Sequence, residues 1–135
     1  MNTDLAFKLA ALTYLGLIAA GGLMPKATGL WSELRALSPF AGTLFRVYYA
    51  FIGLTLFSFG IGSWVFAAEL AAGTPLARGV CGFLTAFWVL RLVAAYLLDV
   101  RPYLKNAWWR AGYAATNVVF GCLPLLYAWG ALRPA

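Results

Sequence analysis

Residues 79–98 read GVCGFLTAFWVLRLVAAYLL and contain a single charged side chain, that of Arg91. An α-helix of about 20 residues rises about 30 Å, which matches the hydrocarbon thickness of a bilayer. An uninterrupted apolar stretch of this length therefore predicts a transmembrane helix. Strands that cross a membrane are shorter and alternate apolar with polar residues, and this segment has no such alternation.

Three further stretches have a similar length and composition. They cover residues 5–23, 47–70 and 107–131. We therefore expect one domain over residues 1–135, an all-α integral membrane protein built as a bundle of four transmembrane helices.

A shorter amphipathic segment lies between the first two stretches, at residues 29–38. Helical periodicity places four large apolar residues on one of its faces: Leu30, Trp31, Leu34 and Leu37. This pattern is typical of a short helix that lies in the membrane interface. We expect an interfacial helix here, between the first and second spans.

The composition agrees with a chain that faces lipid. Of its 135 residues, 64% are hydrophobic and 10% are charged, whereas soluble domains are about half apolar and about a quarter charged. The formal net charge is +6, but the Lys and Arg residues lie mostly at the ends of the apolar stretches. They form no stripe with interleaved aromatic residues, so we expect no binding to nucleic acid.

The positions of the basic residues predict an orientation. Four spans place both termini on one side, together with the connection at residues 71–78. That side carries Lys8, Arg78 and Arg133, and the opposite side carries Lys26, Arg35, Arg46, Arg101, Lys105 and Arg110. Since cytoplasmic segments carry the excess of Lys and Arg, we expect a multi-pass membrane protein with both termini on the non-cytoplasmic side.

Arg91 is the most informative single position. It is predicted to lie about 10 Å inside the cytoplasmic end of its span. Ionisable side chains at such depth usually face the interior of a bundle. Helical side chains lean toward the helix N-terminus, which here points away from the cytoplasmic headgroups. Snorkelling of Arg91 to those headgroups would therefore bend the side chain against its lean.

Polar side chains of the other spans lie at a similar predicted depth, and Trp88 lies one turn before Arg91, where a cation–π contact is expected. The candidate ligand-binding or partner-binding set comprises Arg91, Asn117, Thr116, Thr55, Ser58, Tyr14 and Trp88. None of the chain's four acids is predicted at this depth. Three interpretations of Arg91 remain open. The first is internal pairing with Asn117, with a tyrosine or with the backbone. The second is pairing with an anionic ligand or partner, and the third is snorkelling.

A second candidate site is a basic and aromatic cluster that precedes and opens the last span. It comprises Arg101, Lys105, Arg110, Trp108 and Trp109. Tryptophans and cations at a span end are typical of contact with membrane lipids, and we expect these residues to bind anionic headgroups.

The residues that most enzymes need are missing. The chain has no histidine, which removes the usual ligand of haem, of chlorophyll and of many metal ions, and the commonest general base. No paired carboxylates and no glycine-rich phosphate loop occur. We therefore expect no catalytic activity, no metal and no cofactor. None of the four acids is expected inside the bundle, since Glu69 lies at the end of its span, and this also argues against cation-coupled transport.

Two hypotheses for function remain. The first is an accessory or structural subunit that packs against another membrane protein or against itself. The alternative is a small-molecule or lipid binder, or a transport unit, that uses the intramembrane polar layer around Arg91. No motif in the chain resembles that of a known four-span family.

Overall fold

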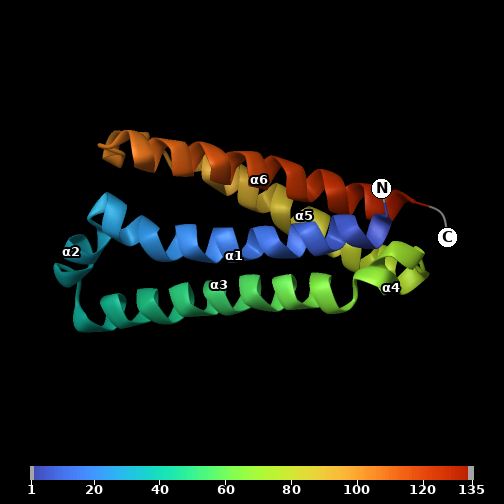
Figure 1. Ribbon diagram of the computed structural model, residues 1–135. Coiled ribbons are helices and arrows are strands. Elements are labelled where there is room, and N and C mark those ends of the chain that lie inside the picture. Colours follow the sequence, from blue (N-terminus) through green and yellow to red (C-terminus); the bar gives the residue numbers. More distant parts are fainter. Residues whose placement is uncertain (1, 134–135) are drawn as a thin grey trace.

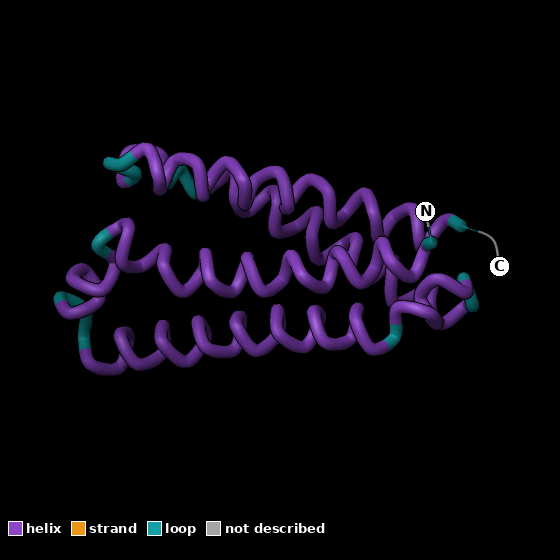
Figure 2. The backbone as a smooth tube through the Cα atoms, in the orientation of Figure 1, coloured by secondary structure: helices purple, strands orange, loops and turns teal. Residues whose placement is uncertain are grey.

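Four long helices carry most of the chain in the computed structural model, which describes residues 2–133. They are α1 (Thr3–Thr28), α3 (Pro39–Val65), α5 (Pro75–Leu97) and α6 (Ala107–Leu132) (Figure 1). The connections hold two short helices, α2 (Leu30–Arg35) and α4 (Ala67–Ala72), and a 3-10 turn, η1 (Arg101–Tyr103). All four long helices are long and apolar enough to cross a membrane. Regular structure in residues 2–133 is entirely helical (Figure 2).

The first span is longer than the expected residues 5–23, because α1 continues through Pro25 to Thr28. A proline inside a helix has no N–H, so the carbonyl four residues earlier loses its partner. Here that carbonyl belongs to Gly21, and it accepts a hydrogen bond from the Tyr49 hydroxyl of α3. The side chain of a neighbouring helix thus satisfies the group that Pro25 leaves unpaired. Gly29, with φ of 73°, then ends α1 in a left-handed conformation.

A Ser-Pro step starts the second span and a Thr-Pro step starts the third, so both spans begin before the expected residues 47 and 79. Ser38 Oγ accepts a hydrogen bond from the Ala41 N–H at 3.3 Å, and Thr74 Oγ accepts one from the Ala77 N–H at 3.2 Å. Each cap is followed directly by a proline, Pro39 or Pro75, at the first helical position, where its missing N–H costs nothing.

The second span ends at Val65, before the expected residue 70. Residues 67–72 form the separate helix α4, which packs against α1 and buries Ala67 and Leu70. The short helix near the other end, α2, is likewise shorter than the expected residues 29–38, and Leu34 is its buried residue.

The long helices associate as two antiparallel pairs, α1 with α3 and α5 with α6. Both chain ends and α4 lie at one end of the bundle, and α2 and the connection from α5 to α6 lie at the other (Figure 1). The pairs meet near the chain ends and diverge toward α2, as the widening space between α1 and α6 shows in Figures 1 and 2.

Burial of side chains follows this divergence. We call residues 3–17, 56–65, 75–88 and 120–132 of the long helices the closed half, and residues 18–28, 39–55, 89–97 and 107–119 the open half. The hydrophobic core lies in the closed half, with Leu70 and Ala67 of α4 beside it. In the open half only Pro25 and Gly42 are buried.

Glycine allows the closest contacts of the closed half. A Cβ atom on Gly130 of α6 would lie 3.0 Å from Cys81 Sγ of α5 and 3.0 Å from Phe7 Cζ of α1. A Cβ atom on Gly60 of α3 would lie 3.0 Å from Tyr14 Cβ of α1. Three helices therefore meet at Gly130 only because it has no side chain.

Replacing Gly130 by valine tests this packing. We expect Gly130→Val to lower the free energy of unfolding by about 2 kcal/mol, because the added atoms must displace Cys81 and Phe7. Gly121→Val on the same helix is the control, since a Cβ atom there meets nothing within 4 Å. Unfolding in detergent micelles, followed by circular dichroism, measures both. Equal losses in the two variants would contradict the close packing.

Candidate functional site

A chain of three hydrogen bonds crosses the closed half and takes one residue from each long helix. Trp88 Nε1 of α5 donates to the Tyr14 hydroxyl of α1 at 2.9 Å. The Tyr14 and Tyr127 hydroxyl oxygens lie 3.1 Å apart, and the Tyr127 hydroxyl of α6 lies 2.7 Å from Ser63 Oγ of α3. All four side chains are at most 2% exposed.

These bonds join the two helix pairs. Tyr14 and Ser63 belong to the pair α1–α3, and Trp88 and Tyr127 belong to the pair α5–α6. Each of the three bonds therefore runs from one pair to the other. An indole N–H can only donate, whereas a hydroxyl both donates and accepts, so this set of four can satisfy its polar groups internally. No buried side-chain nitrogen or oxygen in residues 2–133 lacks a hydrogen-bond partner.

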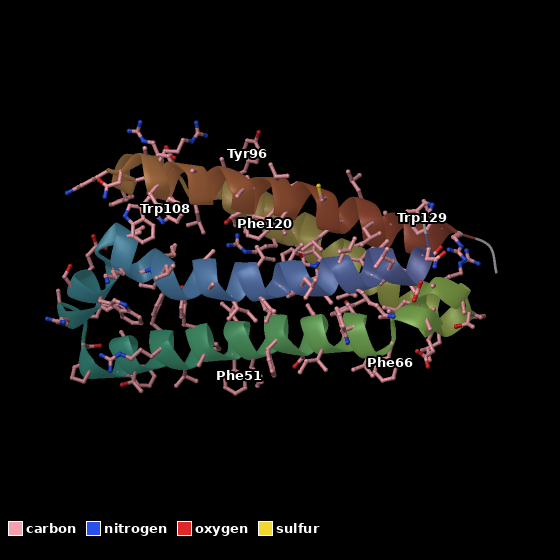
Figure 3. All side chains as sticks on the ribbon, in the orientation of Figure 1. Phe51, Phe66, Tyr96, Trp108, Phe120 and Trp129 are labelled. Carbon is pink, nitrogen blue, oxygen red and sulfur yellow. The ribbon has the colours of Figure 1, made fainter. Side chains whose placement is uncertain are left out.

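Aromatic rings close the core at its boundary with the open half. The rings of Phe59 of α3 and Phe87 of α5 meet edge to face, with centroids 4.9 Å apart. The ring of Trp88 contacts that of Phe120 of α6, with centroids 5.8 Å apart. Figure 3 shows Phe120 on the side of α6 that faces α1. We call Phe59, Phe87, Trp88 and Phe120 the aromatic floor.

Arg91 lies directly beyond this floor, at the start of the open half. Its guanidinium carbon is 4.8 Å from the centroid of the Phe120 ring, and its side chain is half-buried. The cation–π partner is thus Phe120 and not the expected Trp88, because Trp88 directs its indole N–H to Tyr14. Phe120 lies on the side of α6 that faces α1 (Figure 3), so the guanidinium over its ring lies on the side of α6 toward the other helix pair.

The positive charge of Arg91 has no counter-charge within the described residues. The two ion pairs found there are Lys8 with Asp4 at 3.2 Å and Arg101 with Asp99 at 3.5 Å. Neither reaches Arg91, and no hydrogen bond to its guanidinium is found among residues 2–133.

The other members of the predicted polar layer divide into two groups. Tyr14 and Trp88 are brought together in the hydrogen-bond chain. The hydroxyls of Thr55, Ser58 and Thr116 instead donate to carbonyl oxygens of their own helices, at 2.9 Å in each case. Such back-bonding occupies a hydroxyl locally. Asn117 is half-buried, and its amide has no hydrogen bond in the part of the chain that the structure describes.

Two central residues, Ser63 and Tyr127, were not among the predicted site residues. Both lie nearer the chain ends than the depth at which the polar layer was expected. Tyr127 lies seven residues after Phe120 and three before Gly130, and this spacing places all three residues on one helical face. That spacing is the one sequence signal that could have identified Tyr127.

The predicted headgroup cluster lies at the open end of the bundle. Trp108 is 81% exposed, and Arg101 and Lys105 are exposed. Arg110 Nε donates to the Leu104 carbonyl at 3.2 Å, which ties the start of α6 to the loop before it. Trp109 is half-buried.

Two arginines form hydrogen bonds between helices at the opposite end of the bundle, where the chain ends lie. Arg133 donates to Thr3 Oγ1 and to the Ala71 carbonyl, each at 2.7 Å, and so links the end of α6 to α1 and α4. Arg78 Nε of α5 donates to the Ala131 carbonyl of α6 at 2.8 Å. The helix pairs are therefore held together at the chain ends by charged hydrogen bonds as well as by the core.

Two shallow apolar grooves lie on the outside of the closed half. One, of about 270 Å³, runs between α1 and α6 past Thr13 and Cys122. The other, of about 300 Å³, runs between α1 and α3 past Ile18 and Trp64. Arg91 lines neither groove, so they form no part of the site around it.

Comparison with protein-family models, with curated proteins and with solved structures finds no significant match. The function is therefore inferred from the residues and their geometry.

Removing the Tyr127 hydroxyl tests the hydrogen-bond chain. We expect Tyr127→Phe to lower the free energy of unfolding by about 1–2 kcal/mol, because Ser63 and Tyr14 both lose a buried partner. Tyr113→Phe is the matched control on the same helix, since the Tyr113 hydroxyl has no hydrogen bond in the described part of the chain. Denaturant titration in mixed micelles measures both variants. An unchanged stability of Tyr127→Phe would show that the chain of bonds contributes nothing.

Proposed function

We propose that this chain is an integral membrane protein that acts without catalysis, as an accessory or structural subunit of a larger membrane assembly. The half-buried and unpartnered guanidinium of Arg91, located where the two helix pairs begin to diverge, carries the proposal. A charge at membrane depth is costly unless it is paired, so an anionic group from outside the chain would stabilise it.

The outer surface supports location in the bilayer. Four helices are long and apolar enough to cross it. Large apolar side chains point away from the other helices, as Phe51 of α3 and Phe66, the residue after α3, do in Figure 3. Phe51 is 61% exposed and Phe66 is 55% exposed. In water such a surface would drive aggregation, whereas lipid chains cover it without cost.

The orientation follows from the charges at the two ends. The open end carries Lys26, Arg35, Arg46, Arg101, Lys105 and Arg110, and we place it on the cytoplasmic side with both chain ends opposite. There α2, with exposed Trp31 and Leu37, lies in the interface, and the cluster around Trp108 contacts anionic headgroups.

The open half supports a subunit role. Within each pair its helices pack on one another, but Pro25 and Gly42 are the only buried residues that the described open half contains. The closed half, by contrast, has a complete core. A membrane protein with few buried residues in one half, beside a half-buried and unpaired charge, has a surface suited to a partner.

Binding of an anionic amphiphile is the second candidate function. The Arg91 guanidinium lies over the ring of Phe120, on the side of α6 that faces α1 (Figure 3), which favours a ligand that enters between the helix pairs. The two functions differ in the source of the anionic group. A subunit pairs Arg91 with a protein carboxylate, and a binder pairs it with a small molecule or lipid.

Native mass spectrometry of the protein, extracted gently from its own membrane, separates the two functions. We expect the subunit to retain a second polypeptide in a fixed ratio, and Arg91→Leu to release that polypeptide. Arg46→Leu, which removes an exposed arginine of α3 at the open end, is the control and should retain it. A chain that emerges alone, or as a homo-oligomer with a reproducible small mass, would overturn the subunit proposal in favour of the binder.

A further inference from the structure

We propose that a transmembrane helix of a different protein inserts between the α1–α3 and α5–α6 pairs in the open half, and that an aspartate or glutamate on it pairs with Arg91. This inference rests on the proposed subunit function and specifies the chemistry of the partner.

The place for such a helix is defined by burial. The core ends at Leu17 of α1 and at the aromatic floor of Phe59, Phe87, Trp88 and Phe120. Beyond this level the described parts of α1, α5 and α6 continue as helices in which Pro25 is the one buried residue, while Leu92, Ala95 and Val119 remain partly buried against the core. The pairs diverge toward α2 (Figure 1), and a helix seated beside Arg91 on their open-half faces would cover residues that the described chain leaves partly or fully exposed.

The charge of Arg91 specifies what that helix carries. The guanidinium lies over the Phe120 ring, and its N–H groups have no hydrogen-bond acceptor within residues 2–133. A carboxylate binds a guanidinium through two parallel hydrogen bonds, and this pairing becomes stronger as water is excluded. Phe120 has no acceptor to offer these donors, so the site is completed only by an external anion.

A second copy of this chain cannot supply that carboxylate. Its four acids lie at the ends of the helices, at Asp4, Glu33, Glu69 and Asp99. Asp4 and Asp99 are moreover paired with Lys8 and Arg101. None lies at the depth of Arg91, so the partner is a different protein.

Depth distinguishes the helix from a lipid headgroup. Arg91 lies six residues before the end of α5, about 9 Å into the span at 1.5 Å per residue. A lipid phosphate at the membrane surface meets the basic residues of the open end first, and it would have to sink by about that distance to reach Arg91. A helix places its carboxylate at this depth without moving a headgroup out of the interface.

Two model peptides test the pairing. Both are Leu/Ala transmembrane helices that differ at one position, about 10 Å from the cytoplasmic end, which is Glu in one and Gln in the other. Each carries a donor dye, and the full chain carries an acceptor dye on its N-terminal amine. Energy transfer in phosphatidylcholine vesicles measures their association. We expect the Glu peptide to associate about tenfold more tightly than the Gln peptide.

Variants assign this preference to Arg91. It should vanish in Arg91→Leu, persist in part in Arg91→Lys, and remain in full in Arg46→Leu. Equal association of the two peptides with the unmodified chain overturns the pairing, and this comparison needs no variant to fold. A Glu preference that survives Arg91→Leu also overturns it.

The remaining outcomes separate this inference from the proposed function. If the peptides do not differ but a second polypeptide remains attached in native mass spectrometry, the subunit function holds and the Arg91 pairing fails. If added phosphatidylglycerol binds in an Arg91-dependent manner while the peptides do not differ, the anionic group is a lipid headgroup and the helix proposal is wrong.

Discussion

The hydrogen bonds from Trp88 to Tyr14, from Tyr14 to Tyr127 and from Tyr127 to Ser63 link every long helix to the rest of the bundle. Between helices in a membrane there is no hydrophobic driving force, because lipid chains are as apolar as the side chains that they would replace. Close packing and interhelical hydrogen bonds must hold the bundle together. Here both occur at the same end, where Gly60 and Gly130 allow close approach and Arg133 and Arg78 fasten the chain ends.

This concentration of contacts explains the shape of the molecule. The polar groups of the closed half are satisfied internally, whereas Pro25 and Gly42 are the only buried residues in the described open half, where the Tyr49 hydroxyl donates to the Gly21 carbonyl and links α3 to α1. Arg91 lies at the boundary of the two halves, on the aromatic floor. If the bundle closed over Arg91 without a counter-charge, the unpaired charge would destabilise it. If a partner supplied the counter-charge, the resulting ion pair would stabilise the assembly.

The sequence predicted the four long helices because lipid imposes a strict requirement on length and polarity, and each stretch meets it. It also placed Tyr14 and Trp88 at a similar depth, since depth follows from position along a helix, and these two side chains are hydrogen-bonded. It did not predict which way each helix is rotated. Thr55, Ser58 and Thr116 have the expected depth but bond their own helices, and Ser63 and Tyr127 were missed because packing alone sets their direction. The first span was expected to end at residue 23, but α1 continues through Pro25 to Thr28, and the Tyr49 hydroxyl donates to the carbonyl that Pro25 leaves unpaired.

The divergence of the two helix pairs is the feature on which the proposed partner site depends, and spin-label distances in lipid nanodiscs measure it most directly. One label pair joins α1 to α6 in the open half, at Leu23 and Ala111, and the other joins the same helices at the closed end, at Asn2 and Leu132. All four positions are exposed, and Cys81 is buried, so only Cys122 needs replacement. We predict a longer and broader distance distribution for the Leu23–Ala111 pair than for the Asn2–Leu132 pair. Equally short and narrow distributions would show that the bundle closes over Arg91 by itself and offers no site for a partner helix there.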